Sequence, residues 1–236
     1  MENTSASMNT QYGEKQTQMD VSPFLITLIK KYWISREDYA CELIKKYNLH
    51  WKLLDIGCGD GSFCAKNIAN FDTISGIDIS DNRIKKAIEQ SNSIDFSVVD
   101  MNKKIPFEDN HFDCINSLVT FDWIYDLGSA LSETHRILKQ DGIFILEVNN
   151  MGFLLRRIEL LFWKYPKVSA FSKNEWKNIG WDASVCHMFT ENELSGYLQE
   201  FWFSILEVRW SGFAYRLRNW WPSLLCGDLF FVLKKK

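Results

Sequence analysis

Residues 53–63 read Leu-Leu-Asp-Ile-Gly-Cys-Gly-Asp-Gly-Ser-Phe and decide the fold, because an apolar strand runs into three alternate glycines and a helix follows. Glycine at 57, 59 and 61 lets the backbone turn sharply and approach a ligand closely. The helix that follows points free N–H groups and its positive dipole end at the same place. A crevice of this kind at the carboxyl end of a first strand predicts a nucleotide-type binding site.

From residue 51 onward, strand and helix patterns alternate. We expect strands at 51–56, 74–79, 96–100, 113–118 and 143–148, with helices near 61–70, after Ser80 and over 127–139. The pair Asp141-Gly142 predicts that the glycine forms a left-handed cap at the end of helix 127–139. This alternation predicts an α/β fold with a parallel sheet covered on both faces.

The segments outside this alternation are different in character. Residues 1–20 are polar and aperiodic, which predicts a disordered tail before a single domain at 21–236. We expect two amphipathic helices before the first strand, one from Ser22-Pro23 and one from Ser35 or Arg36. The alternation of strands and helices stops at residues 149–188, which predicts an inserted cap. A capping box at Thr190–Glu193 then predicts a helix, and two closing strands are expected at about 205–211 and 228–234.

Composition limits the classes of function. The chain has 236 residues, which suits one domain, and its 27 basic and 30 acidic residues give a net charge of −3. That balance lacks the basic stripe typical of nucleic-acid binding. The six cysteines form no CxxC pair and no metal-ligand spacing, so we expect reduced thiols, no metal and a cytoplasmic protein. The sequence contains no run of 18 apolar residues, so it does not predict a membrane-spanning helix.

Acidic and polar residues follow the ends of successive expected strands. Asp78 ends the second strand, 17 residues beyond Gly61, where a carboxylate can accept both hydroxyls of a ribose. Asp100 ends the third strand, and Ser117 lies at the end of the fourth. One such aspartate alone favours a helix cap or a surface charge. Together these strand ends predict one ligand crevice.

Five motifs stand in a characteristic order: Leu54-Asp55-Ile56-Gly57-Cys58-Gly59-Asp60-Gly61, Gly76-Ile77-Asp78, Val99-Asp100, Pro106-Phe107 with Phe112-Asp113, and Arg136-Ile137-Leu138-Lys139 before Gly142. Over residues 51–150 this order resembles the class I S-adenosylmethionine-dependent methyltransferases. The resemblance implies a Rossmann-like, seven-stranded, mostly parallel sheet with an antiparallel last strand. It also implies S-adenosyl-L-methionine as methyl donor and S-adenosyl-L-homocysteine as product.

The resemblance also implies a role for individual positions. The backbone of 57–61 would face the methionine moiety, with Asp55 steadying that turn. Asp78 would take the ribose, Ile79 would pack on adenine, and Asp100 would read the adenine edge together with the Met101 backbone. The implied cofactor-binding residues are Asp55, Gly57, Cys58, Gly59, Gly61, Asp78, Ile79, Asp100, Met101 and Ser117.

A second, looser resemblance covers 180–190 and 221–228, and it points to the type 11, methionine-biosynthesis-protein-like branch. Many relatives carry a Leu-His-His-type segment after the fourth strand, whereas this chain has Phe121-Asp122-Trp123. A histidine role at that place therefore cannot be carried over.

Methyl transfer from a sulfonium is an in-line displacement, so the protein mainly supplies positioning and exclusion of water, and a base is optional. His187 is the best candidate base because it lies in the cap next to a helix start, and Asp122 and Asp182 follow it. The alternative for His187 is a structural hydrogen bond that holds the cap.

Seven of the ten tryptophans lie between 163 and 221. They favour a partly apolar acceptor, small or lipid-linked and methylated on oxygen, although contact with a membrane surface and simple core filling stay open. The rival interpretations are a non-catalytic partner subunit that keeps the fold and an NAD-dependent oxidoreductase, whose usual Gly-x-Gly-x-x-Gly spacing is absent here. Six of these seven are assigned to the aromatic cap: Trp163, Trp176, Trp181, Trp210, Trp220 and Trp221. Four arginines accompany them as anion-binding groups or solvated faces, namely Arg156, Arg157, Arg216 and Arg218.

Overall fold

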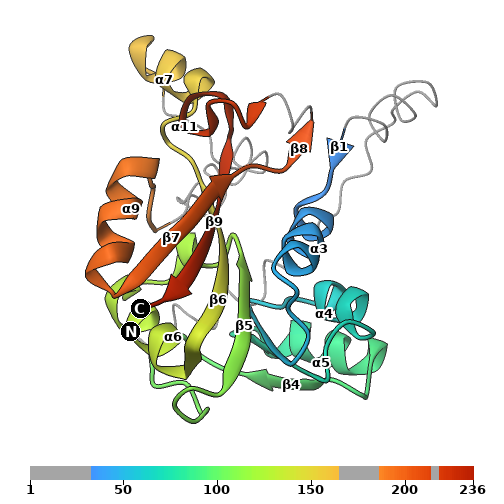
Figure 1. The fold of residues 1–236 in the computed structure, drawn as a ribbon. Helices are drawn as coiled ribbons and strands as arrows, with labels where there is room; N and C mark the ends of the chain where they lie inside the picture. The colour runs from blue at the N-terminus through green and yellow to red at the C-terminus, as the bar shows by residue number, and fades with distance from the viewer. Residues whose placement is uncertain (1–32, 165–185, 214–217) are drawn as a thin grey trace, which may run out of the picture.

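The computed structural model describes residues 33–164, 186–213 and 218–236, and its centre is a seven-stranded sheet (Figure 1). The strand order is β4-β3-β2-β5-β6-β9-β7. The first five strands pair in parallel, and β9 runs antiparallel to both of its neighbours. The predicted Rossmann-like sheet with an antiparallel last strand is confirmed. The bounds are β2 Lys52–Ile56, β3 Thr73–Asp78, β4 Asp95–Val98, β5 Phe112–Leu118, β6 Leu138–Asn149, β7 Phe203–Arg209 and β9 Asp228–Lys235.

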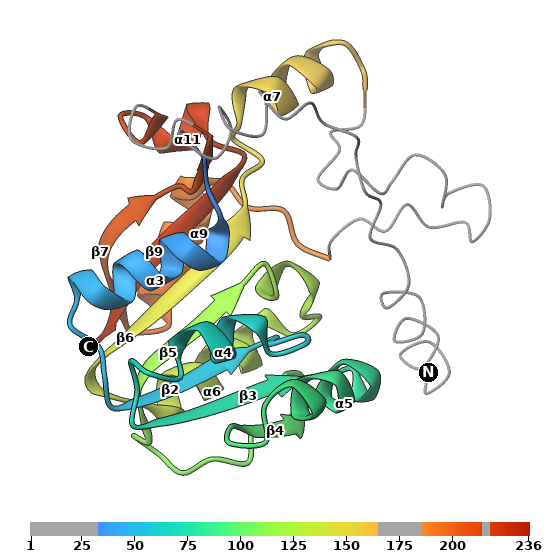
Figure 2. The same cartoon turned by 90° about the vertical axis from the view of Figure 1, so that its right-hand side faces the viewer.

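Helices cover both faces of the sheet because successive residues of a strand point to opposite sides. On β6, Ile143 and Ile145 pack in one cluster with α3 and α4, whereas Phe144 and Leu146 pack in the other with α6 and α9. Figure 2 shows α3 crossing in front of β6 and β9. The bounds are α3 Arg36–Lys46, α4 Ser62–Asn67, α5 Asp81–Gln90, α6 Leu127–Ile137 and α9 Glu191–Glu200.

Local capping chemistry begins two of these helices where the sequence predicts. The Ser35 hydroxyl accepts the Asp38 N–H at 3.1 Å at the start of α3. At the start of α9, the Thr190 hydroxyl accepts the Glu193 N–H at 3.4 Å and donates to the Glu193 carboxylate at 2.7 Å. Such caps satisfy N–H groups that have no partner inside the helix.

The predicted glycine cap after α6 is wrong. The helix ends at Ile137, the chain continues directly into β6, and the left-handed residue is Asp141 (φ +66°), not Gly142. Aspartate tolerates this conformation because its short polar side chain can bond locally. Gly142 is needed for a different reason: a Cβ there would lie 2.8 Å from the carbonyl oxygen of Lys139.

The amino-terminal segment makes a contact that the sequence did not predict. The two-residue strand β1 (Trp33–Ile34) pairs antiparallel with β8 (Gly212–Phe213), which joins parts of the chain that are far apart in sequence. The predicted tail at 1–20 and the predicted helix from Ser22 lie outside the described residues.

The one helix described within the predicted cap at 149–188 is α7 (Leu154–Leu161), and it lies beside the short α11 (Pro222–Leu225), from the segment before β9, beyond one end of the sheet (Figures 1 and 2). The interpretation of Arg156 as a solvated face is wrong. Its side chain is buried, and Nη1 donates to the carbonyl oxygens of Asn150 and Gly227, both at 2.6 Å. Each of these carbonyl oxygens also accepts a backbone N–H, from Phe153 and Asn150 respectively, so the guanidinium uses the second lone pair of each oxygen.

The apolar side chains of this end of the molecule point outward. Leu161, Phe162 and Trp163 at the end of α7 are 74%, 67% and 99% exposed, and Trp220 and Trp221 are exposed beside α11. Trp210, in contrast, is buried with the Arg218 guanidinium 4.1 Å from its ring centroid. The other two tryptophans of the predicted cap, at 176 and 181, lie outside the described residues, as do Asp182 and Arg216. None of the helices among the described residues is long and apolar enough to cross a bilayer.

Candidate cofactor and acceptor site

The glycine turn after β2 requires its glycines. Gly57, Gly59 and Gly61 have φ values of +77°, +58° and +82°, a region that L side chains rarely adopt. A Cβ on Gly57 would lie 1.9 Å from Oγ1 of Thr120, and one on Gly61 would lie 2.7 Å from the ring of Phe96. At Gly59 the nearest atom would be 3.8 Å away. The turn is therefore packed from behind at two glycines and open at the middle one.

A second unusual backbone residue lies beside this turn. Val119, directly after β5, has φ +58°, which is a true outlier for a β-branched residue. Its N–H donates to the carbonyl oxygen of Glu147 on β6 at 3.0 Å, which holds it in place. Strained residues of this kind are typical of functional sites, where the surrounding structure over-determines them.

Buried polar groups fix the strand ends beneath the turn. Asp55 is buried and accepts from Nδ2 of Asn116 at 2.7 Å and from Sγ of Cys64 at 3.6 Å. Burial raises the pKa of Asp55 to about 7. The Ser117 hydroxyl donates to the carbonyl oxygen of Ile56 at 3.1 Å. These side chains bond to neighbouring strands, which agrees with a steadying role for Asp55 and leaves Ser117 only its backbone for a ligand.

Asp78 ties the end of β3 to the glycine turn. Its carboxylate accepts the Gly59 N–H at 3.0 Å and the Ser80 N–H at 2.8 Å. Nη1 of Arg83 lies 4.0 Å from the same carboxylate. Each carboxylate oxygen has two lone-pair sites, so these bonds leave room for further donors such as ribose hydroxyls.

The residues beyond Asp78 supply apolar surface and a second carboxylate. Ile79 is 45% exposed, as a wall for a flat ring requires. Asp100 follows β4 and accepts from the backbone N–H and Nδ2 of Asn102 at 3.0 and 2.8 Å, while Met101 is buried. Cys58 is also buried, and burial raises the pKa of its thiol.

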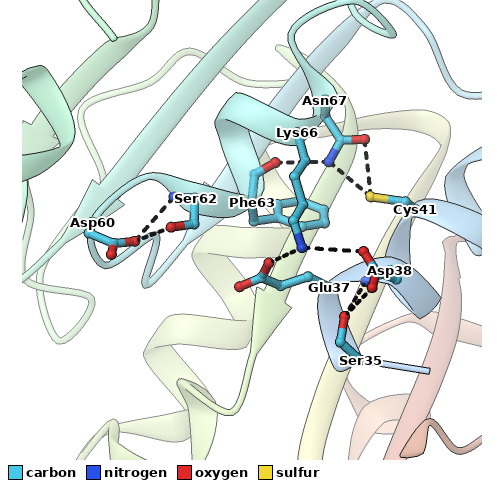
Figure 3. A network of polar contacts seen from close by, with 9 residues as sticks. All are labelled: Ser35, Glu37, Asp38, Cys41, Asp60, Ser62, Phe63, Lys66 and Asn67. Atoms are coloured by element: carbon cyan, nitrogen blue, oxygen red, sulfur yellow. Dashed lines mark hydrogen bonds and ion pairs between the residues drawn. The ribbon is translucent and has the colours of Figure 1, made fainter. Parts of the chain in front are cut away.

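Polar contacts attach α3 to the helix that follows the glycine turn (Figure 3). Nζ of Lys66 on α4 bridges the carboxylates of Glu37 and Asp38 on α3, at 2.5 and 3.2 Å. At the start of α4, the Asp60 carboxylate accepts from the backbone N–H and the hydroxyl of Ser62, at 3.2 and 2.6 Å. The network places α3 as a wall next to the turn.

The two candidate bases, Asp122 and His187, are in backbone contact with each other. Asp122 belongs to the single-turn helix η1 (Phe121–Trp123), and its carbonyl oxygen accepts the His187 N–H at 3.0 Å. The ring nitrogen Nε2 of His187 lies 2.8 Å from the carbonyl oxygen of Ile124. The Asp122 carboxylate is buried and accepts from Nδ2 of Asn149 at 2.7 Å, and burial raises its pKa to about 7. In this arrangement Asp122 fixes the end of β6, and His187 is partly exposed.

The sequence analysis missed Glu147, near the carboxyl end of β6. It is fully buried, and within the described residues neither carboxylate oxygen has a hydrogen-bond partner. The nearest cation is Nε of Arg36 at 3.8 Å, and burial raises the pKa of Glu147 to about 8. The signal was present, because Glu147 is the one charged residue in the apolar run 143–148.

The residues present fit an adenosyl amino acid. The middle of the turn offers open space at Gly59, the carboxylates of Asp78 and Asp100 lie at the ends of adjacent strands, and Ile79 offers an exposed apolar face. A neutral ribose needs hydrogen-bond acceptors, and an adenine ring needs an apolar wall and an acceptor for its amine.

Sheet order and site together define a Rossmann-like domain that binds a nucleoside at its strand ends. Comparison with known proteins makes this specific: residues 54–146 match the family described as "Methyltransferase domain". The match covers 93 of the 236 residues, and over this stretch the chain is similar to S-adenosylmethionine-dependent methyltransferases, whose fold it shares.

Individual relatives agree with this assignment in fold. An S-adenosylmethionine-dependent methyltransferase from Mesorhizobium loti has a TM-score of 0.65 at 17% identity, covering 85% of this chain and 98% of that one. The human mitochondrial arginine-hydroxylase NDUFAF5 is 38% identical over 39% of this chain and 27% of its own length. The malonyl-[acyl-carrier protein] O-methyltransferase of Buchnera aphidicola is 30% identical over 43% and 41%. The chain thus spans less than half the length of these two curated relatives.

Proposed function

We propose that this protein transfers the methyl group of S-adenosyl-L-methionine to an oxygen of a small or lipid-linked acceptor. The observation that carries the proposal is the glycine turn, with its middle residue open at Gly59 and the Asp78 carboxylate bonded to that same residue. Donor binding by the ten residues named in the sequence analysis is part of this proposal.

The cofactor supplies a methyl group already activated on a sulfonium, so this chain's residues need only bind, orient and exclude water. The turn holds the amino-acid end, and Asp78 accepts from the ribose. In this proposal Nδ1 of His187 accepts the proton of the attacking hydroxyl, because Nε2 donates to the carbonyl oxygen of Ile124, and Asp122 positions His187 because its carbonyl oxygen accepts the His187 backbone N–H.

The acceptor is proposed to be partly apolar. The outward-facing side chains of Leu161, Phe162 and Trp163 at the end of α7 support this, as does Trp220 beside α11. The name of one relative, a malonyl-[acyl-carrier protein] O-methyltransferase, supports methylation on oxygen. We also propose a cytoplasmic protein that acts on small molecules and not on nucleic acids, with peripheral membrane contact through α7 as one route to a lipid-linked acceptor.

The second candidate is a non-catalytic partner or regulatory subunit that keeps the fold and the cofactor site. The name of one relative, an arginine hydroxylase, supports considering this candidate, because it shows that a domain of similar sequence can have an activity other than methyl transfer. The two candidates differ in one observable, which is turnover.

The test is release of S-adenosylhomocysteine from methyl-labelled S-adenosylmethionine, with cytosolic and lipid fractions as acceptor sources. We expect label in an extractable small molecule or lipid. Binding of S-adenosylhomocysteine without any turnover would favour the partner candidate.

The His187→Ala variant tests the base in the same assay. We expect turnover to fall at least about tenfold, within the range for losing a general base, with S-adenosylhomocysteine affinity unchanged. Unchanged turnover would assign His187 to the scaffold that holds residues 186–190.

A further inference from the structure

A group of charged residues lies at the carboxyl end of β6, beyond the residues that bind the donor. Three carboxyl groups take part: those of Asp122 on η1 and Glu147 on β6, which are buried, and that of Asp228 on β9, which is partly exposed. Three guanidinium groups interact with them electrostatically, those of Arg36, Arg156 and Arg218. Burial raises the pKa of all three carboxyl groups, so near neutral pH the positive charges of this group outweigh the negative ones.

Three members of this group have hydrogen-bond partners in the protein. Asp122 accepts two N–H groups of Asn149. Arg156 donates to the carbonyl oxygens of Asn150 and Gly227, and Arg218 donates to the carbonyl oxygen of Leu225. These side chains hold the strand ends together and are committed to that role.

Glu147 differs from them. Its exposed fraction is 0%, and both oxygens lack a hydrogen-bond partner among the residues that the structure describes. The Arg36 guanidinium forms an ion pair with Glu147 at 3.8 Å, which is too long for a hydrogen bond, and the Arg36 side chain is 49% exposed. A buried, unpaired polar group destabilises a protein and calls for a specific explanation.

The register of the sheet shows where Glu147 lies relative to the donor turn. Asp55, Asn116 and Ile145 form one row across β2, β5 and β6. Two residues further along the strands come Gly57 and Glu147, so they lie at the same level, two strands apart. Neighbouring strands are about 4.8 Å apart, which puts the two roughly 10 Å from each other across the sheet. A small acceptor can span that distance.

The side chain of Glu147 points to the same face as Asp55. Ile145, two residues before it, packs in the cluster of α3 and α4, and Arg36 belongs to α3. Figure 2 shows that α3 crosses this part of the sheet, and the Tyr39 ring on α3 packs on Phe230 of β9 at 5.1 Å. Glu147 therefore lies between the sheet and the helix that walls the donor turn.

We propose that Glu147 is an acceptor-binding residue whose carboxyl group receives a hydrogen bond from a hydroxyl of the methyl acceptor. This inference rests on the proposed function, because it locates the acceptor next to the donor turn. It also supplies the missing partner for the two unpaired oxygens.

The charges favour a hydroxyl over an ammonium group. Three guanidinium groups already face carboxyl groups that burial keeps partly protonated, so a further cation would be buried without a counter-charge, which is costly. Burial also raises the pKa of Glu147 to about 8, which weakens the attraction for a cation near neutral pH. A neutral hydroxyl has neither disadvantage.

The experiment compares the wild-type chain with Glu147→Met, which removes the hydrogen-bond acceptor, using two probes that each carry one octyl chain. Octyl β-D-glucoside carries hydroxyl donors, and octylammonium carries a cation on the same alkyl chain. Both are titrated below their aggregation thresholds into protein saturated with S-adenosylhomocysteine, with tryptophan fluorescence as the signal. Glu207→Met is the matched control, since Glu207 is a largely buried carboxylate that Lys46 and Tyr47 already satisfy.

We expect Glu147→Met to weaken glucoside binding at least tenfold, with octylammonium binding unchanged and Glu207→Met like the wild type. Equal glucoside affinity in the wild type and Glu147→Met, including no binding by either, would overturn the inference. Selective loss of octylammonium would also overturn it, in favour of a cationic acceptor. Saturation with S-adenosylhomocysteine is measured first. Its absence would count against the proposed function itself, a different outcome from a failure at Glu147.

Discussion

The two halves of the strand-end crevice are built differently. In the half at β2 and β3, polar groups are bonded to the chain itself, as the Asp78 carboxylate is to the N–H groups of Gly59 and Ser80. In the half at β6 and β9, Glu147 is buried with no hydrogen-bond partner among the described residues. The Asp78 carboxylate in the first half has hydrogen-bond donors before a ligand binds, whereas the Glu147 carboxyl group in the second half has none among the described residues. The comparison suggests that the donor site is preformed and that the acceptor completes the other half.

The strongest way to break the donor half is Gly57→Ala. A Cβ at φ +77° is strained, and it would overlap Oγ1 of Thr120 at 1.9 Å. We expect the free energy of unfolding to fall by about 2–4 kcal/mol. We expect S-adenosylhomocysteine affinity to fall about 100-fold, the equivalent of about 3 kcal/mol. Urea denaturation and calorimetric titration measure the two effects.

Gly196→Ala is the control, because a Cβ there meets nothing within 4 Å and the residue lies inside α9. It should stabilise the protein by about 0.5–1 kcal/mol. If Gly57→Ala behaves like Gly196→Ala, the turn is not constrained as described.

A milder change to the donor half is Asp78→Asn. The amide keeps the shape but loses the charge, and it weakens the bonds to Gly59 and to a ribose. Hydrogen bonds to charged groups contribute about 1.5–3 kcal/mol, so we expect a loss of about 10- to 100-fold in S-adenosylhomocysteine affinity. Asp81→Asn is the comparison, since Asp81 pairs with Lys85 on the exposed surface of α5. Equal S-adenosylhomocysteine affinities for Asp78→Asn and Asp81→Asn would show that Asp78 does not bind the ligand.

The acceptor half is tested by the stability of Glu147→Met. Removing an unpaired buried carboxylate relieves about 1–3 kcal/mol, so Tm at pH 8 should rise by roughly 2–10 °C. A lower Tm would show that the pair with Arg36 stabilises the fold.

The pH dependence of this effect has a definite sign. The folded-state pKa of Glu147 is raised to about 8 by burial, whereas the unfolded value lies near 4.5. Between these values the folded chain binds more protons, so wild-type stability falls as pH rises. Arg36, Asp122 and Asp228 interact electrostatically with Glu147, and their own contributions to the pH dependence of stability are present in both the wild type and the variant. We expect the stabilisation by Glu147→Met to be largest above pH 8 and to vanish near pH 4, as measured by urea denaturation at several pH values.

The smallest expected effect is that of Lys66→Met, in the network that joins α3 to α4. Lys66 is 43% exposed, so its pairs with Glu37 and Asp38 are screened by solvent. We expect a loss of about 0.5–1 kcal/mol in stability, close to the upper range for surface pairs. Lys85→Met, which removes one exposed pair on α5, should cost less. A loss above about 2 kcal/mol would show that α3 depends on this contact.

The sequence predicted the donor half well because its signals are local. Alternating strands, glycines at 57, 59 and 61 and the strand-end Asp78 lie within a single βαβ unit, where spacing and turn chemistry determine the structure. The seven-stranded order, in contrast, followed from a family resemblance. The left-handed residue after α6 was assigned to Gly142 where the structure has it at Asp141, because both residue types tolerate that conformation.

The acceptor half was harder to predict because its signals are long-range. The pairing of β1 with β8 joins Trp33 to Phe213, and two-residue strands have no periodicity to detect. Arg156 was expected in solvent, but carbonyl oxygens of Asn150 and Gly227 bury it. Glu147 was included in an expected strand, and only the fold shows that it lacks a partner. Binding roles for all of these residues stay predictions.

The central claim is that donor and acceptor are bound by separate halves of one crevice, and calorimetric titration with S-adenosylhomocysteine tests it most directly. We predict one site per chain, with affinity reduced about 10- to 100-fold by Asp78→Asn and unchanged by Glu147→Gln. An absence of binding to the wild-type chain, or an equal loss in both variants, would contradict the account.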